Sequence, residues 1–273
     1  LGLAPVVGAF ANDFHDWPAF WSAGATVGTA DLVPAGAHSA WQSARGLPAA
    51  FFPYPAGTAW LFAPFAPLPL SVGFVLFGLL MLACAGAAGV VGARVYGLER
   101  RTAVLAVLAF GPVTASVVIG QNGPLGLLLA LAAIDGLGAA DRGAVRGRWQ
   151  AGLAIGLLLF KPTWGLPLVG LLILRRRWAE LGIVAVVAAG WYLAGVAAAA
   201  GDWWWPRDWL DGLGDYLAAD FAGNADKAVS LPGLVARLPV PPLVPLVAGA
   251  AVLVLALPRL LRAPIDEAVG ATC

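Results

Sequence analysis

The chain has 273 residues, of which 60% are hydrophobic and only 11% charged, and its net charge is +1. Soluble domains carry about 25% charged residues, so this composition excludes an ordinary soluble domain, and disorder would need low hydrophobicity and high net charge. The near-zero net charge also argues against a nucleic-acid partner, which requires a basic surface. We therefore expect an all-α, polytopic integral membrane protein.

The first polar region, residues 12–57, follows an apolar segment, residues 1–11, which is shorter than a span and lacks the basic region of a signal peptide. We interpret residues 1–11 as the end of a first membrane helix. The following membrane helices are predicted over residues 70–93, 102–120, 124–137, 151–160, 165–174, 179–200 and 243–257. Three of these stretches are short for a span, which needs about 20 residues.

Residues 151–174 form an apolar stretch long enough for one span, but Lys161 and Pro162 lie at its centre. A charge at membrane depth is costly, and proline removes a backbone hydrogen bond from a helix. We therefore predict a hairpin of two half-length helices. Such broken helices need protein or a water-filled cavity to satisfy their backbone.

The distribution of basic residues supports this hairpin. If the chain turns back at Lys161, one side of the membrane holds eleven of the sixteen basic residues and the other side holds five. The eleven are Arg94, Arg100, Arg101, Arg142, Arg146, Arg148, Arg175, Arg176, Arg177, Arg259 and Arg262. The positive-inside rule places this set in the cytoplasm. Residues 12–57 and 201–242 then become two outer loops of a single transmembrane domain, residues 1–273.

In the second outer loop, apolar residues between 210 and 221 follow helical spacing, and Asp208, Asp211 and Asp215 fall on another face. This pattern predicts an interfacial helix that lies flat on the membrane. The three tryptophans at 203–205 suit the headgroup region. Two interpretations stay open: a plain membrane anchor, or contact with a lipid substrate.

Small residues at 85–92 (AGAAGVVG) predict close packing between helices. Cys84 and Cys273 are too far apart in the sequence for a disulfide framework or a metal motif, and nothing beside His38 has metal-ligand spacing. We therefore expect no metal site and interpret His38 as a surface residue. The glycine-rich and zinc-binding motifs of soluble enzymes are also missing, which argues against a nucleotide as direct substrate.

The first outer loop opens with the most distinctive group of residues in the chain. Asp13, His15 and Asp16 place two carboxylates and an imidazole immediately after a membrane helix, beside aromatic residues such as Trp21. A carboxylate in this setting is suited to act as a general base, and aromatic walls suit sugar rings. The alternative is that Asp13 or Asp16 only caps the next helix, because aspartate is a preferred N-cap residue.

Lys161, at the tip of the predicted hairpin, offers an ammonium that can pair with a phosphate. Gln121 and Asn122 lie in the neighbouring outer turn and supply amide donors and acceptors at a similar depth. Ordinary explanations exist for these residues too. Lysine side chains extend to the membrane interface, and amide side chains are common in turns.

Four patches resemble, in order and spacing, glycosyltransferase family 87, a group of polytopic membrane enzymes with the GT-C architecture. They are DWPAFWSAG at 16–24, FPYP at 52–55 with PFAPLP at 64–69, GQNG at 120–123, and FKP at 160–162 with RRW at 176–178. The second patch contains Tyr54 and departs from the family pattern, because alanine follows Pro55 where the family has a second proline.

The resemblance implies transfer of mannose from a polyprenyl-phosphate donor to a glycolipid or glycan acceptor, with inversion and with no cofactor. It implies a bacterial inner-membrane protein whose active site faces the periplasm and whose partners are membrane lipids, the lipid-linked sugar and the acceptor. It assigns the catalytic aspartate to Asp16, with Asp13 in reserve. The substrate-binding residues it implies are Lys161, Gln121, Asn122, His15, Trp21 and Tyr54.

Two functions of other classes stay open on the sequence. One is a transporter or flippase of lipid-linked or small solutes, whose site would be made by broken helices, although no inverted repeat is visible. The other is a non-catalytic membrane scaffold that binds polyprenyl phosphate without turnover. Sugar transfer by the purified protein would distinguish the enzyme from both.

Overall fold

The computed structural model describes residues 16–224 together with Val247 and Ala251. Within these residues the regular elements are helices, with no strand, which confirms the all-α expectation. They are α2 (Trp17–Ala25), α3 (Ala35–Ser43), the 3₁₀ helices η1 (Ala56–Leu61) and η2 (Ala63–Phe65), α4 (Leu70–Tyr96), α5 (Arg100–Ala109), α6 (Gly111–Val118), α7 (Gly123–Asp141), α8 (Val145–Leu158), α9 (Pro162–Leu174), α10 (Trp178–Ala198) and α11 (Trp205–Asn224). The predicted helices at 1–11 and 243–257 lie outside the described residues, apart from Val247 and Ala251.

Three helices, α4, α7 and α10, are long and apolar enough to cross a membrane. The predicted helix at 102–120 is a bent pair, α5 and α6, whose axes differ by 54° and which together could form a fourth span. The break coincides with Pro112 in the first turn of α6, since proline there has no N–H to continue the preceding helix. The chain is therefore a polytopic membrane protein.

The hairpin predicted at Lys161 is present. Helix α8 ends at Leu158 and α9 begins at Pro162, with Lys161 at the N-cap position of α9. Proline suits the first turn of a helix because the N–H it lacks has no intrahelical partner there. Two short helices therefore replace the single long helix that residues 151–174 could have formed.

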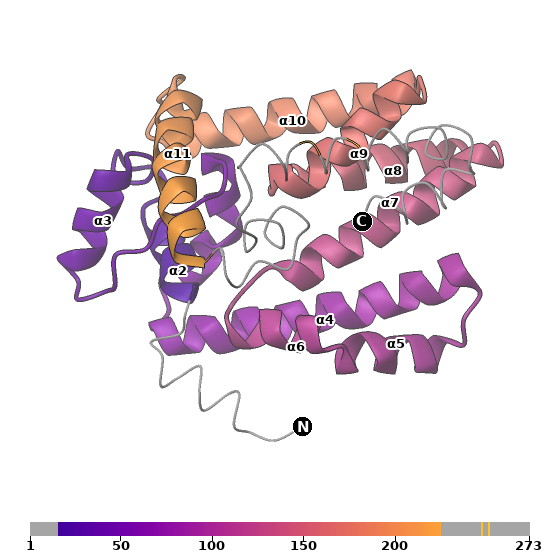
Figure 1. The fold of residues 1–273 in the computed structure, drawn as a ribbon, viewed down its shortest axis with the longest axis horizontal. Coiled ribbons are helices and arrows are strands. Elements are labelled where there is room, and N and C mark those ends of the chain that lie inside the picture. The colour runs from indigo at the N-terminus through magenta and orange to yellow at the C-terminus, as the bar shows by residue number, and fades with distance from the viewer. Residues whose placement is uncertain (1–15, 225–246, 248–250, 252–273) are drawn as a thin grey trace.

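The bundle is layered, with α7 between α4 and α8, and α8 in turn against α10. Figure 1 shows α4 and α10 along the long axis of the molecule, with α2, α3 and α11 gathered at one end. The turns that join α4 to α5 and α9 to α10 lie at the opposite end, and these turns carry arginines. The structure thus separates an arginine-rich end from the end that holds the predicted outer loops.

The predicted interfacial helix is α11, which crosses the end of α10 at a steep angle in Figure 1. Leu210 and Leu217 are more than half exposed, and Trp204 is 79% exposed. Large apolar side chains held in this way suit a helix at the surface of a bilayer. Both interpretations of this helix, as an anchor or as a lipid contact, are compatible with this geometry.

Glycines let the helices of the bundle approach closely. A Cβ at Gly136 would lie 2.6 Å from the backbone nitrogen of Ala151, and one at Gly147 would lie 2.5 Å from that of Ala140, so α7 and α8 meet backbone to backbone. In the small-residue stripe of α4, a Cβ at Gly89 would lie 2.6 Å from the Cα of Val104. The packing role predicted for that stripe is confirmed.

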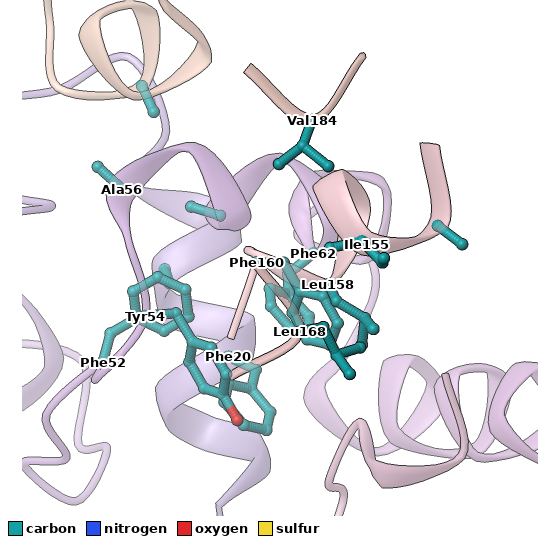
Figure 2. Close-up of a cluster of buried hydrophobic side chains, with 14 of the residues drawn as sticks. Phe20, Phe52, Tyr54, Ala56, Phe62, Ile155, Leu158, Phe160, Leu168 and Val184 are labelled. Carbon is teal, nitrogen blue, oxygen red and sulfur yellow. The ribbon is translucent and has the colours of Figure 1, made fainter. Parts of the chain in front are cut away.

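An aromatic core joins the first loop to the hairpin. Figure 2 shows Phe20 from α2 beside Phe52, Tyr54 and Phe62, with Phe160 from the α8–α9 turn nearby. The rings of Phe20 and Phe62 stack at 4.8 Å between centroids, and those of Tyr54 and Phe160 at 6.3 Å. Since these rings are buried, the segment around Tyr54 is fixed relative to the hairpin tip.

Element η1 completes this attachment. A Cβ at Gly57 would lie 2.5 Å from the carbonyl oxygen of Trp191, so η1 rests directly on α10. The hydroxyl of Thr58 donates to the carbonyl of Phe160 at 3.2 Å. The first loop therefore contacts both α10 and the hairpin.

We expect Gly147→Ala to lower the free energy of unfolding by about 1–3 kcal/mol, because the added methyl would overlap the α7 backbone. The matched control is Gly182→Ala in α10, where a Cβ meets nothing within 4 Å and the better helix propensity of alanine makes the change neutral or stabilising. Thermal unfolding in detergent measures both. Equal effects of the two substitutions would contradict this account of the packing.

Candidate functional site

Asp16 lies at the N-cap position of α2, but its carboxylate makes no capping hydrogen bond. Its backbone N–H donates to the carbonyl of Ile119 at 3.3 Å, and its carboxylate accepts a hydrogen bond from Nε2 of Gln121. The side chain is thus turned toward the α6–α7 turn and is exposed. Capping, the ordinary explanation for this aspartate, is not what its carboxylate does.

The meeting of Asp16 and Gln121 depends on Trp17 and Gly120. Trp17 is fully buried, and its indole N–H donates to the carbonyl of Leu70 at 2.9 Å. Gly120 has φ +75°, which side-chain-bearing residues rarely adopt, and a Cβ there would lie 3.0 Å from the Cβ of Trp17. The glycine of the GQNG turn is therefore required for both the turn and the contact.

Tyr54 organises the two amides of this turn. Its hydroxyl lies 3.4 Å from Oε1 of Gln121 and 3.3 Å from Oδ1 of Asn122, and since both oxygens can only accept, the hydroxyl donates between them. Burial raises the pKa of Tyr54 to about 12, with the Asn122 hydrogen bond lowering it and the charge of Asp16 adding to the rise. Tyr54 therefore stays protonated at physiological pH and remains a donor.

Asn122 retains one hydrogen-bond donor without a partner. The residue is only 1% exposed and occupies the N-cap position of α7, yet its side chain makes no capping hydrogen bond. Its Nδ2 has no partner among the described residues. A buried donor left unpaired costs about 1–3 kcal/mol, a cost that an oxygen atom of a bound ligand would remove.

Lys161 lies near the ring of Tyr54. Its ammonium is 5.6 Å from the centroid of the Tyr54 ring and 4.3 Å from that of Trp164, and the residue is half-buried. In the part of the chain that the structure describes, no carboxylate lies within ion-pair distance of it, although the charge of Asp16 acts on it at longer range. Lys161 is thus a cation held by aromatic rings and open to an anion.

A cavity of about 280 Å³ lies between α7 and α9, next to these polar groups. Two of its lining residues, Gly123 and Thr163, directly follow Asn122 and Pro162 in the sequence. Its lining is mostly apolar and consists of Gly123, Gly126, Leu127, Ala130, Leu158, Thr163, Trp164, Pro167 and Leu168. The ring of Trp164 lies against Gly126, where an added Cβ would be 1.7 Å from a ring carbon. The apolar cavity therefore lies beside the polar cluster, with Trp164 contacting both the cavity and the Lys161 ammonium.

The family of this protein follows from its similarity to a known family model. The family model described as glycosyltransferase family 87 matches residues 51–272, which is most of the chain. The chain belongs to glycosyltransferase family 87. No curated protein and no solved structure matches it. Together with its apolar helices, this membership makes the protein a membrane glycosyltransferase.

The family 87 match includes Tyr54, Gln121, Asn122 and Lys161, and Asp16 precedes it. The structure brings these five residues together around one cluster, as described above. Their roles stay predictions.

Other predicted site residues fall elsewhere. The indole N–H of Trp21 is used by the carbonyl of Leu68 at 3.1 Å, and its ring packs near that of Trp41, so this side chain supports the loop rather than the cluster. Asp13 and His15 lie outside the described residues. No group of three or more potential metal-ligating side chains occurs within the described part of the chain.

Trp164 and the cavity were not predicted from the sequence. Trp164 follows Lys161 by three residues, and that helical spacing could have placed its ring beside the ammonium. The cavity depends on Gly126 facing Trp164 across two helices, and a single sequence carries no signal for that pairing.

The expectation that His38 lies on the surface is wrong. His38 is 3% exposed, with Nδ1 3.1 Å from the carbonyl of Leu32 and Nε2 2.8 Å from the hydroxyl of Ser22. Because the carbonyl can only accept, Nδ1 carries the proton, and the neutral ring accepts from Ser22. Gln42 extends this network by donating to the same hydroxyl at 2.8 Å. The residues beside His38 in the sequence do not indicate its burial, because His38 is buried where its own loop folds back onto α2.

The loop should lose stability in mild acid because of His38. Burial lowers the pKa of His38, and the Leu32 hydrogen bond and the charge of Asp31 oppose this shift only in part. Below about pH 6.5 the unfolded chain binds a proton that the folded chain does not, so stability falls as pH decreases, by at most about 1.4 kcal/mol per pH unit.

Thermal unfolding in detergent at pH 7.5 and 5.5 measures this effect. His38→Gln should flatten the pH dependence, and His15→Gln, at the only other histidine of the chain, serves as the control. A dependence that disappears in the His15 variant and persists in the His38 variant would refute the assignment.

Proposed function

We propose that this family 87 glycosyltransferase transfers a hexose, mannose by its resemblance, from a polyprenyl-phosphate donor to a hydroxyl of a lipid or glycan acceptor. We place the reaction at the outer, periplasmic face of a bacterial inner membrane, since the site lies at the end of the bundle away from most of the arginines. The observation that carries the proposal is the cluster of Asp16 and Lys161 beside an apolar cavity, with the Lys161 ammonium 4.3 Å from the ring of the lining residue Trp164.

The cavity supports a lipid-linked donor. A polyprenyl phosphate has an anionic head and an apolar chain. The site offers the Lys161 ammonium, which has no ion-pair partner among the described residues, beside an apolar space between α7 and α9. With part of the polyprenyl chain in that space, the phosphate would lie near Lys161 and near Nδ2 of Asn122, which has no hydrogen-bond partner among the described residues. A soluble nucleotide sugar would leave the apolar wall unused.

In the proposed mechanism, the oxygen of the acceptor hydroxyl attacks the anomeric carbon of the donor sugar, and Asp16 accepts the proton of that hydroxyl. The new glycosidic C–O bond forms as the bond to the phosphate oxygen breaks, and the lipid phosphate leaves with the electron pair. The attack comes from the face opposite the leaving group, so the anomeric configuration inverts. Lys161 and Asn122 stabilise the negative charge that grows on the phosphate.

Two further residues are positioning residues in this scheme. Gln121 donates to the Asp16 carboxylate and so directs it. Tyr54 stays protonated and holds the amide oxygens of Gln121 and Asn122, which leaves both amide nitrogens free to donate, one to Asp16 and one to the substrate. The aromatic core of the first loop fixes Tyr54 in turn.

Asp16→Asn should lower kcat by at least about 100-fold, because the amide keeps the shape of the carboxylate but cannot accept the proton. The assay is transfer from labelled polyprenyl-phosphate sugars into mixed membrane lipids. Asp211→Asn, at an exposed carboxylate of α11, is the control and should leave activity unchanged. Near-normal transfer by a folded Asp16→Asn variant would overturn the role of Asp16.

Lys161→Met should lower kcat/KM for the lipid-linked donor by about 100-fold, since the charge facing the phosphate is lost while the apolar stem is kept. Lys161→Arg restores a charge and should recover part of that loss. Because Lys161 has no ion-pair partner among the described residues, thermal stability should not fall in the Met variant. Equal activity of the Met and Arg variants would show that the positive charge is not used.

A further inference from the structure

The arginine-rich end of the bundle carries a second, separate groove. It lies between α4 and α5 and has a volume of about 510 Å³. Gly86 and Val90 line it from α4, and Leu105 lines it from α5. Glu99, Arg100 and Arg101, at the start of α5, line it as well. The groove therefore joins an apolar trough to two guanidinium groups.

The shape of the groove follows from the way the two helices cross. They touch at Gly89, where only glycine allows the backbone of Val104 to approach. One turn earlier, a Cβ at Gly86 would meet nothing within 4 Å, so the space beside that residue is open. Leu105 is 56% exposed along the same trough. Since α4 runs toward the arginine-rich end, Gly86 lies deeper in the bundle than Arg100.

The two arginines are free of acidic partners in the described part of the chain. At the same end, Arg94 pairs with Asp135 at 3.0 Å, and Arg177 pairs with Asp141 at 2.6 Å. Arg100 and Arg101 have no such pair with any described residue.

The neighbouring carboxylate of Glu99 is already in use. It accepts from the backbone N–H groups of Arg101, at 2.8 Å, and Thr102, at 2.6 Å, and so caps α5. With one carboxylate against two guanidinium groups, the end of the groove keeps an excess of positive charge.

We propose that this groove binds an anionic phospholipid of the surrounding bilayer, with its phosphate between Arg100 and Arg101 and one acyl chain along the trough past Val90 to Gly86. Guanidinium groups bind phosphate oxygens through paired hydrogen bonds, and arginines at the membrane surface attract anionic lipids. The apolar trough selects a phosphate that carries a hydrocarbon chain over a free phosphate. This site is independent of the transferase reaction at the other end of the bundle.

The test measures binding of phosphatidylglycerol to the purified full chain, by native mass spectrometry and by the lipid-dependent rise in Tm. The double variant R100Q/R101Q should bind it about tenfold more weakly. The matched control R146Q/R148Q removes the same charge from two exposed arginines at the start of α8, at the same end of the bundle, and should bind it normally. Equal loss in both double variants would refute the site, because it would show only general attraction to a basic surface.

Two further measurements separate the contribution of the lipid's acyl chain from that of its phosphate head group. Gly86→Leu fills the trough without changing charge, and it should weaken phosphatidylglycerol binding several-fold. Glycerol phosphate, which lacks the chain, should bind far more weakly than the lipid and be insensitive to Gly86→Leu. Equal binding of phosphatidylcholine and phosphatidylglycerol, or binding of the lipid that Gly86→Leu leaves unchanged, would overturn the proposal.

Discussion

The burial of Trp17 is the contact on which the site depends, because it joins the two segments that carry the polar cluster. Its ring stacks on Phe77 of α4 at 5.0 Å and meets Phe65 edge-on at 5.7 Å, and its N–H is used by the carbonyl of Leu70. Its neighbour Asp16 is thereby held at the outer end of α4, where Gly120 lets the α6–α7 turn approach. A smaller side chain at position 17 would release Asp16 from Gln121 without touching either residue.

From this anchor, a chain of hydrogen bonds sets the direction of each polar atom in the cluster. The Tyr54 hydroxyl can donate only one proton, and it lies between two amide oxygens. In this arrangement both amide oxygens face the hydroxyl, so Gln121 presents its nitrogen to Asp16 and the nitrogen of Asn122 has no partner among the described residues. Burial raises the pKa of Tyr54 to about 12, so its hydroxyl remains a donor over the physiological pH range.

Much of this architecture could be predicted from the sequence, because membrane helices are governed by length, apolarity and charge. The break at Lys161 follows from a charge and a proline whose cost inside a span is high, and α11 follows from the helical spacing of its apolar residues. The contacts between distant segments could not be predicted. The burial of His38 could not be predicted because its partners Ser22 and Leu32 come within hydrogen-bond distance only when the loop folds back. The α7–α9 cavity depends on how two helices pack together, and the spacing of residues along the sequence does not indicate that packing.

The cluster is also poorly satisfied by the protein itself, and this bears on its role. Arg177, at the other end of the bundle, is held by Asp141 and Glu180, as expected of a charge that stabilises the fold. The Lys161 ammonium lies near aromatic rings, but no carboxylate of the described residues is within ion-pair distance of it. The buried Nδ2 of Asn122 likewise has no hydrogen-bond partner among those residues. Both features cost stability in the free protein, and an anion at the cavity mouth would relieve both at once. This supports the proposed donor, because the phosphate of a lipid-linked sugar has both the charge and the attached apolar chain that such a site would bind.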